Sequence, residues 1–344
     1  MPTLPMLDKN VNHSPHVVLL GAGASLASFK EGDANKRILP LMNNFVEVVG
    51  LNKLLEKNEI NYNNQNFEEI YNDLSENEKY NALVRSIEEK TFEYFSQLKI
   101  PSTPTIYDYL VLSLREKDII ATFNWDPLLL QAYARNSGVK RLPRLEFLHG
   151  NVGMGVCVKD KVMGHIWNRC SKCKEFLKPV KLLYPIKKKD YSSDSVIKAQ
   201  WDSLRSHLNY AYMFTIFGYS APTTDIDAKE LMLSVWKNNK TLELAEVEII
   251  DTKSEKEIIK TWKDFTFSHH YQIHKSFFDS YLARFPRRSC DAFAESSLMC
   301  KFLEENKFPK FENIEEMHKW IKPLIEEEES MRRINPLFSL KHDN

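Results

Sequence analysis

The sequence predicts an α/β fold: a Rossmann-like, doubly wound parallel sheet with a helical insertion and a helical C-terminal region. Two observations lead to this prediction. Short apolar runs alternate along the chain with segments of helical periodicity, as expected of strands buried on both faces of a parallel sheet. Each apolar run also ends in glycine or polar residues, at the place where an open α/β sheet holds its ligand.

The first expected strand is the run Val17–Leu20, which ends at the glycine turn Gly21–Gly23. Two glycines allow a sharp turn and the close approach of a ligand. Ser25 is expected to cap the following helix, whose free N–H groups would face a phosphate. Because Leu26 stands where the dinucleotide fingerprint has a third glycine, an ordinary strand–turn–helix without ligand is the alternative interpretation.

The apolar spacing over about residues 41–97 is helical and predicts an insertion between the first and second strands. This insertion directly follows the glycine turn and is therefore placed to cover it. The second buried run, 118–123, ends in Asn124–Asp126, and Pro127 is expected to open the next helix.

A short strand is expected at 145–148, directly before His149. Two further strands, at 212–217 and 245–250, end at Gly218 and Asp251. Thr224 and Asp225 are expected to cap the helix between these strands. Because parallel strands direct their carboxyl ends to one edge of a sheet, the polar residues that follow them predict a single nucleotide-type site.

Two segments lie outside this alternating pattern. Residues of about 151–183 are expected to form an irregular excursion that contains three of the five cysteines. The chain from 254 onward is predicted to be largely helical. The site residues therefore all precede the C-terminal region.

Composition describes a globular chain of 344 residues with 47 basic and 47 acidic side chains. This balance gives no signal for nucleic acid as the main ligand. The short charged runs Lys187–Lys189 and Glu326–Glu329 are interpreted as solvated surface. No apolar stretch is long enough to span a membrane, and the N-terminal residues do not resemble a signal peptide, so with an odd number of cysteines a cytoplasmic location is expected.

Four motifs together resemble those of the sirtuin superfamily, over about residues 16–260. They are Gly21–Ser25, Thr122–Asp126, His149-Gly150, and Gly218–Ser220 with Pro222 and Asp225. The last form, and the stretch Asn66–Tyr71, are similar to divergent prokaryotic members of the superfamily. The segment Leu26–Gly32 lacks the GIPDFR-like stretch of the lysine deacylases, so deacylation is not expected.

The resemblance implies a sirtuin-like NAD-binding domain at 1–260, followed by a helical C-terminal region at 261–344. It further implies a NAD hydrolase that releases nicotinamide and ADP-ribose, of the type used in phage defence (abortive infection). Asn124 is expected to orient water or ribose, and His149 to accept a proton. Asp126 is expected to fix the loop or the ribose, with a helix N-cap as the alternative. The residues expected to contact NAD are Gly21, Ala22, Gly23, Ser25, Thr122, Gly218, Ser220 and Asp251.

Two other functions remain open from the sequence. One is a module that senses NAD or ADP-ribose without turnover and regulates a protein partner. The other is a dehydrogenase in which Glu47 binds the ribose, although Asn124 and His149 then lack a role. A homo-oligomer is expected through the aromatic-rich C-terminal residues 264–338, with packing of that region onto the sheet as the alternative.

Cys170 and Cys173 have the spacing of metal ligands, and the resemblance implies a four-cysteine ribbon here. Only Cys157 joins them, with His165 as a candidate fourth ligand. A degenerate ribbon without metal is the preferred interpretation, and a structural zinc the alternative. The histidines at 269, 270 and 274 are interpreted as part of a helical packing face.

Overall fold

The computed structural model describes most of the chain. The described residues are 14–63, 65–186, 189–222, 225–239, 245–266, 271–298 and 300–334. Within them no helix combines the length and the apolar character that a membrane crossing needs.

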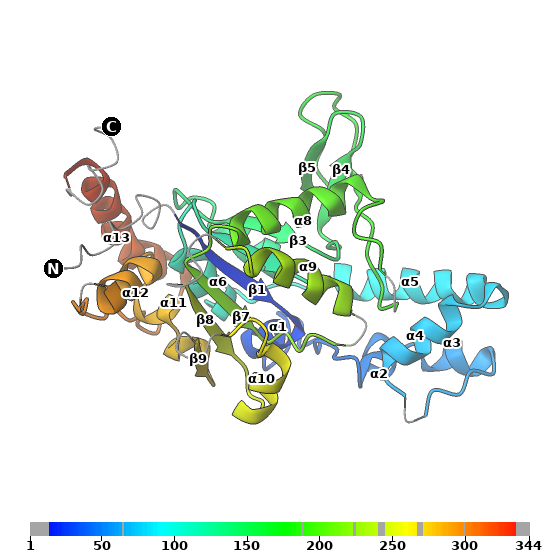
Figure 1. The fold of residues 1–344 in the computed structure, drawn as a ribbon. Helices are drawn as coiled ribbons and strands as arrows, with labels where there is room; N and C mark the ends of the chain where they lie inside the picture. The colour runs from blue at the N-terminus through cyan, green and yellow to red at the C-terminus, as the bar shows by residue number, and fades with distance from the viewer. Residues whose placement is uncertain are drawn as a thin grey trace.

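A six-stranded, all-parallel sheet forms the centre of the molecule (Figure 1). Its spatial order is β3-β2-β1-β7-β8-β9, so the strand order reverses between β1 and β7. The strands are β1 (His16–Leu20), β2 (Ile119–Thr122), β3 (Arg144–Phe147), β7 (Met213–Phe217), β8 (Glu246–Ile250) and β9 (Tyr271–His274). The predicted doubly wound α/β fold is confirmed.

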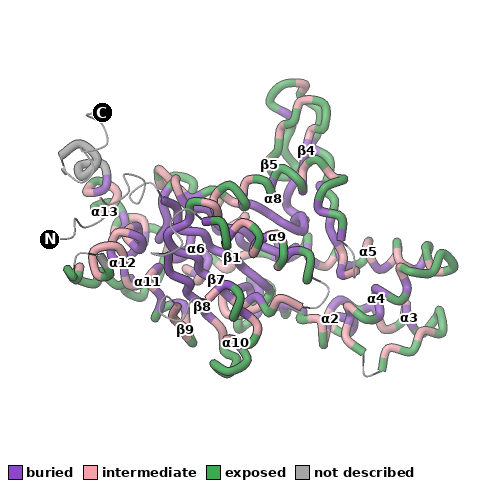
Figure 2. Tube along the Cα trace, in the orientation of Figure 1, coloured by how far each residue is buried: buried purple, intermediate pink, exposed green. Residues whose placement is uncertain are grey.

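Helices cover both faces of this sheet because the strand side chains alternate between two apolar cores. In β1, Val18 and Leu20 belong to one core, and Val17 and Leu19 to the other. The first core includes residues of α1 (Ala22–Ser28), α6 (Ile106–Ser113) and α7 (Leu128–Arg135). The second includes residues of α8 (Ser195–Leu208), α9 (Ile226–Trp236) and α10 (Glu255–Trp262). Figure 2 shows the strands as the most buried part of the chain.

The insertion after α1 is helical, as predicted, and extends away from the sheet (Figure 1). It consists of α2 (Phe45–Val49), α3 (Asn52–Lys57), α4 (Phe67–Ser75), the 3₁₀ turn η1 (Glu78–Tyr80) and α5 (Asn81–Ser96). Its aromatic rings pack against Trp125, whose ring centre lies 6.2 Å from Phe45 and 5.9 Å from Phe95. Trp125 follows β2, so the insertion rests on the loop that carries Asn124 and Asp126.

The excursion after β3 is ordered, whereas the sequence analysis expected it to be irregular. It forms a three-stranded antiparallel sheet of β4 (Met154–Cys157), β5 (Val162–His165) and β6 (Lys178–Pro179), which we call the ribbon. Gly155 and Gly164 lie opposite each other, and Leu177 packs over both. The strands have only two to four residues each, too few to show a clear alternation in the sequence.

The region after α10 contains a strand, β9, which corrects the predicted helical packing face at His274. β9 adds to the edge of the sheet beside β8, so the sheet extends beyond the boundary expected at residue 260. His269 and His270 lie outside the described residues. The chain then continues through η4 (Phe277–Asp279), α11 (Tyr281–Arg284), α12 (Ser289–Leu298) and α13 (Ile314–Ile334).

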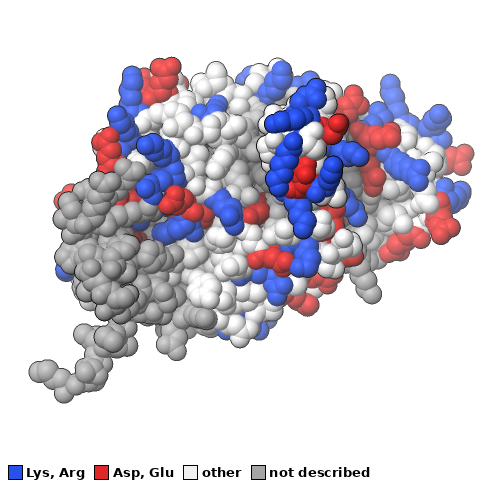
Figure 3. Space-filling view, turned by 90° about the horizontal axis from the view of Figure 1, so that it is seen from above, with Lys and Arg blue, Asp and Glu red and all other residues white. Residues whose placement is uncertain are grey.

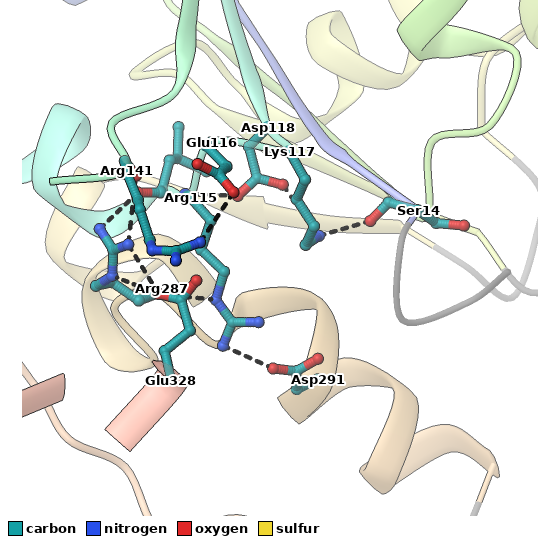
Figure 4. A network of polar contacts seen from close by, with 10 residues as sticks. Ser14, Arg115, Glu116, Lys117, Asp118, Arg141, Arg287, Asp291 and Glu328 are labelled. Atoms are coloured by element: carbon teal, nitrogen blue, oxygen red, sulfur yellow. Dashed lines mark hydrogen bonds and ion pairs between the residues drawn. The ribbon is translucent and has the colours of Figure 1, made fainter. Parts of the chain in front are cut away.

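The C-terminal helices are joined to the sheet by buried ion pairs (Figure 4). Arg287 pairs with Glu328 of α13 at 2.8 Å and donates to the carbonyl of Leu114 at 3.0 Å. Arg115, just before β2, pairs with Asp291 of α12 at 2.8 Å. Glu328 is therefore buried, not part of a solvated charge run. These contacts agree with the alternative in which the C-terminal region packs onto the sheet. That the region also forms a homo-oligomer stays a prediction.

Candidate functional site

The turn after β1 is held by close contact with the turn after β7. The Gly21 N–H donates to the Phe217 carbonyl (3.0 Å), and the Gly23 N–H donates to the Gly218 carbonyl (2.9 Å). A Cβ on Gly21 would lie 2.5 Å from Tyr219 Cα, and one on Gly23 would lie 2.8 Å from Gly218 Cα. The glycines are thus required by contact between two backbone segments, in addition to the sharp turn and the close approach of a ligand for which the sequence suggested them.

Helix α1 begins at Ala22, with Gly21 in the N-cap position, so Ser25 lies inside the helix. The expectation that Ser25 caps this helix is wrong, because the helix starts one turn earlier. Gly218 has φ +61°, and a Cβ there would lie 2.3 Å from the Ala24 nitrogen. A side chain at Gly218 is therefore excluded both by backbone conformation and by space.

The remaining candidates lie along the same edge of the sheet. Ser220 is exposed two residues after Gly218. Asp251 follows β8, is half-buried, and accepts a hydrogen bond from the Lys253 N–H at 2.9 Å. Thr122, the last residue of β2, accepts a bond from the Asn124 N–H at 3.0 Å and so helps to place Asn124. Their contacts with a nucleotide stay predictions.

Asn124 is held in one orientation by its amide nitrogen. Nδ2 donates to the Gly21 carbonyl and to the Ser25 hydroxyl, both at 2.9 Å. Because a backbone carbonyl can only accept, the nitrogen must be the atom on this side, which fixes the position of Oδ1. Among the described residues none hydrogen-bonds to this Oδ1, and the residue is half-buried. The site therefore has a preorganised acceptor.

A buried hydroxyl and carboxylate network lies behind Asn124. The Ser25 hydroxyl donates to Asp126 Oδ2 at 2.7 Å and lies 2.5 Å from the Tyr107 hydroxyl. Asp126 Oδ1 also accepts from the Leu128 N–H at 3.1 Å, as a cap of α7 would. Burial raises the pKa of Asp126. Asp126 thus fixes the loop. The hydrogen-bonding capacity of the Ser25 hydroxyl is satisfied by Asp126, Tyr107 and Asn124.

Tyr107 completes this network, and the sequence gives no sign of its role. It lies on α6, is fully buried, and directs its hydroxyl to Ser25 and, at 3.4 Å, to Asn124. The helical periodicity of 106–114 marks the position as apolar core. Nothing in the sequence indicates that the hydroxyl has a partner as distant along the chain as Ser25.

His149 lies in a buried polar cluster that combines four segments of the chain. Its Nε2 is 3.3 Å from the Tyr191 hydroxyl and 3.8 Å from Asp225 Oδ1. Asp225 also pairs with Lys189 and accepts from the Tyr219 hydroxyl at 2.9 Å. Asp225 occupies the N-cap position of α9, as expected, but its side chain makes no cap hydrogen bond because it is engaged in this cluster. Thr224 lies outside the described residues.

Lys189 is buried against this cluster, which contradicts its interpretation as solvated surface. Its ammonium group and His149 lower the pKa of Asp225 against the effect of burial. Burial lowers the pKa of His149 to about 4, so the imidazole is neutral near pH 7. The negative charge of Asp225 lies 3.8 Å from Nε2, beyond hydrogen-bond distance, and favours a proton on that nitrogen electrostatically, which leaves the lone pair on Nδ1.

Phe123 connects the two halves of the site. Its ring stacks on Tyr219 with 4.3 Å between centroids and meets the His149 ring edge-on at 4.7 Å. Asn124 follows Phe123 in the chain, so Phe123 joins the loop of the fixed amide to the imidazole cluster. The structure groups Asn124 and Asp126 with Ser25 and Tyr107. It groups His149 with Lys189, Tyr191 and Asp225. The catalytic roles of Asn124, Asp126 and His149 stay predictions.

The ribbon gathers Cys157, Cys170 and Cys173 with Asp160, all with ligand atoms within 4.8 Å of one another. The sulfur atoms of Cys157 and Cys173 are 3.6 Å apart. Tetrahedral zinc with four such ligands separates thiolates by about 3.8 Å, so the donor set fits this metal. Asp160, not His165, takes the fourth position; His165 lies on β5 and is exposed.

Glu47 does not fit the dehydrogenase alternative. It lies on α2 in the insertion and is exposed, whereas a ribose-binding acid of a dinucleotide fold follows the second strand. That position is taken here by the segment Thr122–Asn124. The sequence spacing of Glu47 from the glycine turn was therefore coincidental.

No family model and no curated protein matches the sequence. Solved structures with a similar fold include a Sir2 homolog–NAD complex, at 15% identity over 77% of this chain and 86% of that chain (TM-score 0.40). A second, titled "Structural Basis for the Mechanism and Regulation of Sir2 Enzymes", has 20% identity over 78% and 93% (TM-score 0.39). A third is a complex of Sir2 with a p53 peptide and NAD+, at 17% identity over 80% and 93% (TM-score 0.36).

Proposed function

We propose that this protein is a NAD glycohydrolase, which cleaves NAD to nicotinamide and ADP-ribose at the carboxyl edge of the sheet. The observation that carries the proposal is the amide of Asn124, whose nitrogen is held by Gly21 and Ser25 so that Oδ1 is a fixed acceptor. A preorganised neutral acceptor can hold a water molecule or a ribose hydroxyl without adding charge. The motif resemblance of the sequence supports NAD as the substrate.

The reaction needs little acid catalysis, because nicotinamide leaves from a pyridinium that is already cationic. The bond between ribose C1′ and the nicotinamide nitrogen breaks, and both electrons leave with nicotinamide, which becomes neutral. The oxygen of water bonds to C1′ and loses one proton. His149 is suited to accept that proton at Nδ1, since its imidazole is neutral and its Nε2–H faces Asp225.

The other residues have supporting roles in this proposal. Asp126 and Ser25 hold the amide of Asn124, and Thr122 holds its backbone. Ala22 and Gly23 keep part of their surface exposed at the start of α1, beside Gly218, and are proposed contacts of the pyrophosphate. Ser220 and Asp251 are proposed contacts for phosphate or ribose further along the same edge.

The test pairs catalysis with binding. Purified protein is incubated with NAD, and free nicotinamide is measured for the wild type and Asn124→Ala, beside NAD binding by calorimetry. We expect the variant to bind NAD and to release nicotinamide about a hundred- to a thousandfold more slowly, because it lacks the positioning amide. Near-wild-type turnover in the variant would remove Asn124 from the mechanism.

The same assay decides between hydrolysis and sensing. Binding of NAD without release of nicotinamide, with or without candidate activators, would favour a sensing module that regulates a protein partner. For the hydrolase we further propose a role in phage defence, by depletion of NAD in the infected cell. In that case wild-type protein, but not Asn124→Ala, should reduce plaque formation and lower cellular NAD when expressed in infected bacteria.

We also propose a structural zinc ion in the ribbon, held by Cys157, Cys170, Cys173 and Asp160. Three thiolates and a carboxylate are a donor set that zinc accepts. Metal analysis of the purified protein should give about one zinc per chain, and Cys170→Ser should lose it. Equal zinc content in the variant and the wild type would show that the metal, if any, is bound elsewhere.

A further inference from the structure

The ribbon differs from the rest of the molecule in its charge. The segment 157–181 contains seven of the 47 Lys and Arg residues of the chain but only two of its 47 acidic residues. All seven basic side chains are exposed: Lys159, Lys161, Arg169, Lys172, Lys174, Lys178 and Lys181. Figure 3, which looks down onto the projecting ribbon of Figure 1, shows basic side chains gathered there.

These basic groups have few acidic neighbours, although Lys159 interacts electrostatically with Asp160. Within the part of the chain that the structure describes, no ion pair holds any of the seven. Lys172 and Lys174 donate only to backbone carbonyls. Asp160, one of the two acids, faces the cysteine cluster, where its carboxylate accepts from Cys157 and Cys170. The ribbon therefore offers its positive charge to a partner.

Large apolar side chains are exposed on the same short segment. Trp167 is 75% exposed, Val158 71%, Phe176 57% and Met163 40%. These are four of eleven large hydrophobic residues exposed anywhere in the described chain. The Arg169 guanidinium lies over the Phe176 ring, 4.0 Å from its centroid, and so presents a flat cation–π pair at the surface.

The partner must therefore carry both negative charge and flat apolar groups. A partner that carries only negative charge would make no contact with the exposed aromatic rings. A purely apolar partner would leave the seven positive charges unpaired. Single-stranded nucleic acid satisfies both requirements, because phosphates pair with Lys and Arg while unpaired bases stack on aromatic rings. A duplex fits less well, because its bases are stacked on one another and not free to meet Trp167 or Phe176.

We propose that the ribbon is a binding surface for single-stranded nucleic acid. The balanced charge of the whole chain does not oppose this, since binding depends on the local density of positive charge. The ribbon is also joined to the candidate site, because the Leu183 N–H, which follows β6, donates to the His149 carbonyl at 2.9 Å. The proposal is independent of NAD hydrolysis, and its test uses no NAD.

The experiment measures fluorescence polarisation of labelled dT and U oligomers of about 20 nucleotides with the full-length protein, over a series of salt concentrations. We expect binding at low salt that weakens linearly in log Kd against log salt. Trp167→Ala should weaken binding about tenfold through the lost stacking. The double substitution of Lys172 and Lys174 by Ala should reduce the salt slope by about 1.4.

Matched controls come from the C-terminal region, where Phe302 and Lys310 are also exposed. Phe302→Ala and Lys310→Ala should leave the affinity unchanged. Absence of binding at low salt would overturn the proposal. The proposal would also be overturned if dextran sulfate bound with equal affinity and Trp167→Ala had no effect, which would indicate an acidic protein partner. Binding only to vesicles that contain phosphatidylserine would overturn it as well.

Discussion

Two buried polar clusters lie at opposite ends of the strands of the same sheet, one at the amino edge and one at the carboxyl edge. Each contains a histidine whose pKa is lowered by burial. Burial lowers the pKa of His16, at the start of β1, to about 4, and it does the same for His149 after β3. The difference is in their hydrogen bonds. His16 bonds Ser289 through Nδ1 and Thr215 through Nε2, both at 2.7 Å, whereas the partners of His149 lie at Nε2.

A perturbed pKa therefore does not by itself identify a reactive group. The cluster at the amino edge is closed: His16, Asp118, Arg287 and Glu328 all have partners within the protein. The cluster at the carboxyl edge leaves the Oδ1 of Asn124 and the Nδ1 of His149 without a partner among the described residues. Acceptors that the fold holds but does not use are what a substrate can bind.

The largest effect expected from this comparison is on catalysis. His149→Ala should lower nicotinamide release about a hundred- to ten-thousandfold by removing the proton acceptor, while NAD binding remains. His16→Ala is the matched control at the other edge, and the rate per folded molecule should not change. A loss of rate in His16→Ala as large as in His149→Ala would show that the two edges are not functionally distinct.

The second effect is on stability and concerns the amino edge. Arg287→Ala removes the hydrogen-bonded partner of the buried Glu328 carboxylate and leaves it the Arg115 guanidinium at 3.7 Å, so the free energy of unfolding should fall by about 3 kcal/mol. Denaturant titration of wild type and variant measures this difference. The exposed pair Lys198–Asp202 on α8 is the control, and Lys198→Ala should cost less than about 1 kcal/mol.

Much of the fold and the position of the candidate site can be predicted from the sequence. Strand ends can be predicted because apolar runs stop at glycine or polar residues, and parallel strands bring Gly21, Asn124 and His149 to one edge. The roles of Tyr107 and Lys189 could not be predicted, because a hydroxyl in a helical apolar pattern and a lysine in a charged run have no local sign of their partners. The strand β9 was missed since its four residues carry no clear pattern.

A smaller effect follows from pH. The pKa of His16 is about 4 in the folded protein and about 6.5 when unfolded, so between these values only the unfolded chain is protonated. The stability that neutral His16 contributes is therefore complete above pH 6.5 and is lost as the pH falls toward 4. The cost of His16→Ala should shrink by about 2 kcal/mol between about pH 7 and about pH 5.

Denaturation of wild type and His16→Ala at both pH values measures this change. Taking the difference between the two proteins removes the contributions of groups that titrate in both, such as Glu246, whose pKa burial raises to about 8. The charged groups that face His16 are Asp118, Glu248 and Lys117, and all three are present in both proteins. A cost that is independent of pH would mean that His16 is protonated equally in the folded and unfolded states.

The smallest expected effect tests whether the network behind Asn124 acts on catalysis or only on packing. Tyr107→Phe keeps the ring in the core and removes the hydroxyl that lies 2.5 Å from the Ser25 oxygen. One lost hydrogen bond of about 1 kcal/mol corresponds to about fivefold in rate, if the bond serves to position Asn124.

Tyr109→Phe on the same helix is the matched control, because the Tyr109 hydroxyl bonds Pro309 and Phe311 of the C-terminal region. We expect both variants to lose similar stability, while only Tyr107→Phe lowers kcat, with KM unchanged. If the two variants had the same kcat, the hydroxyl of Tyr107 would serve the core alone, and the amide of Asn124 would be held sufficiently by Gly21 and Ser25.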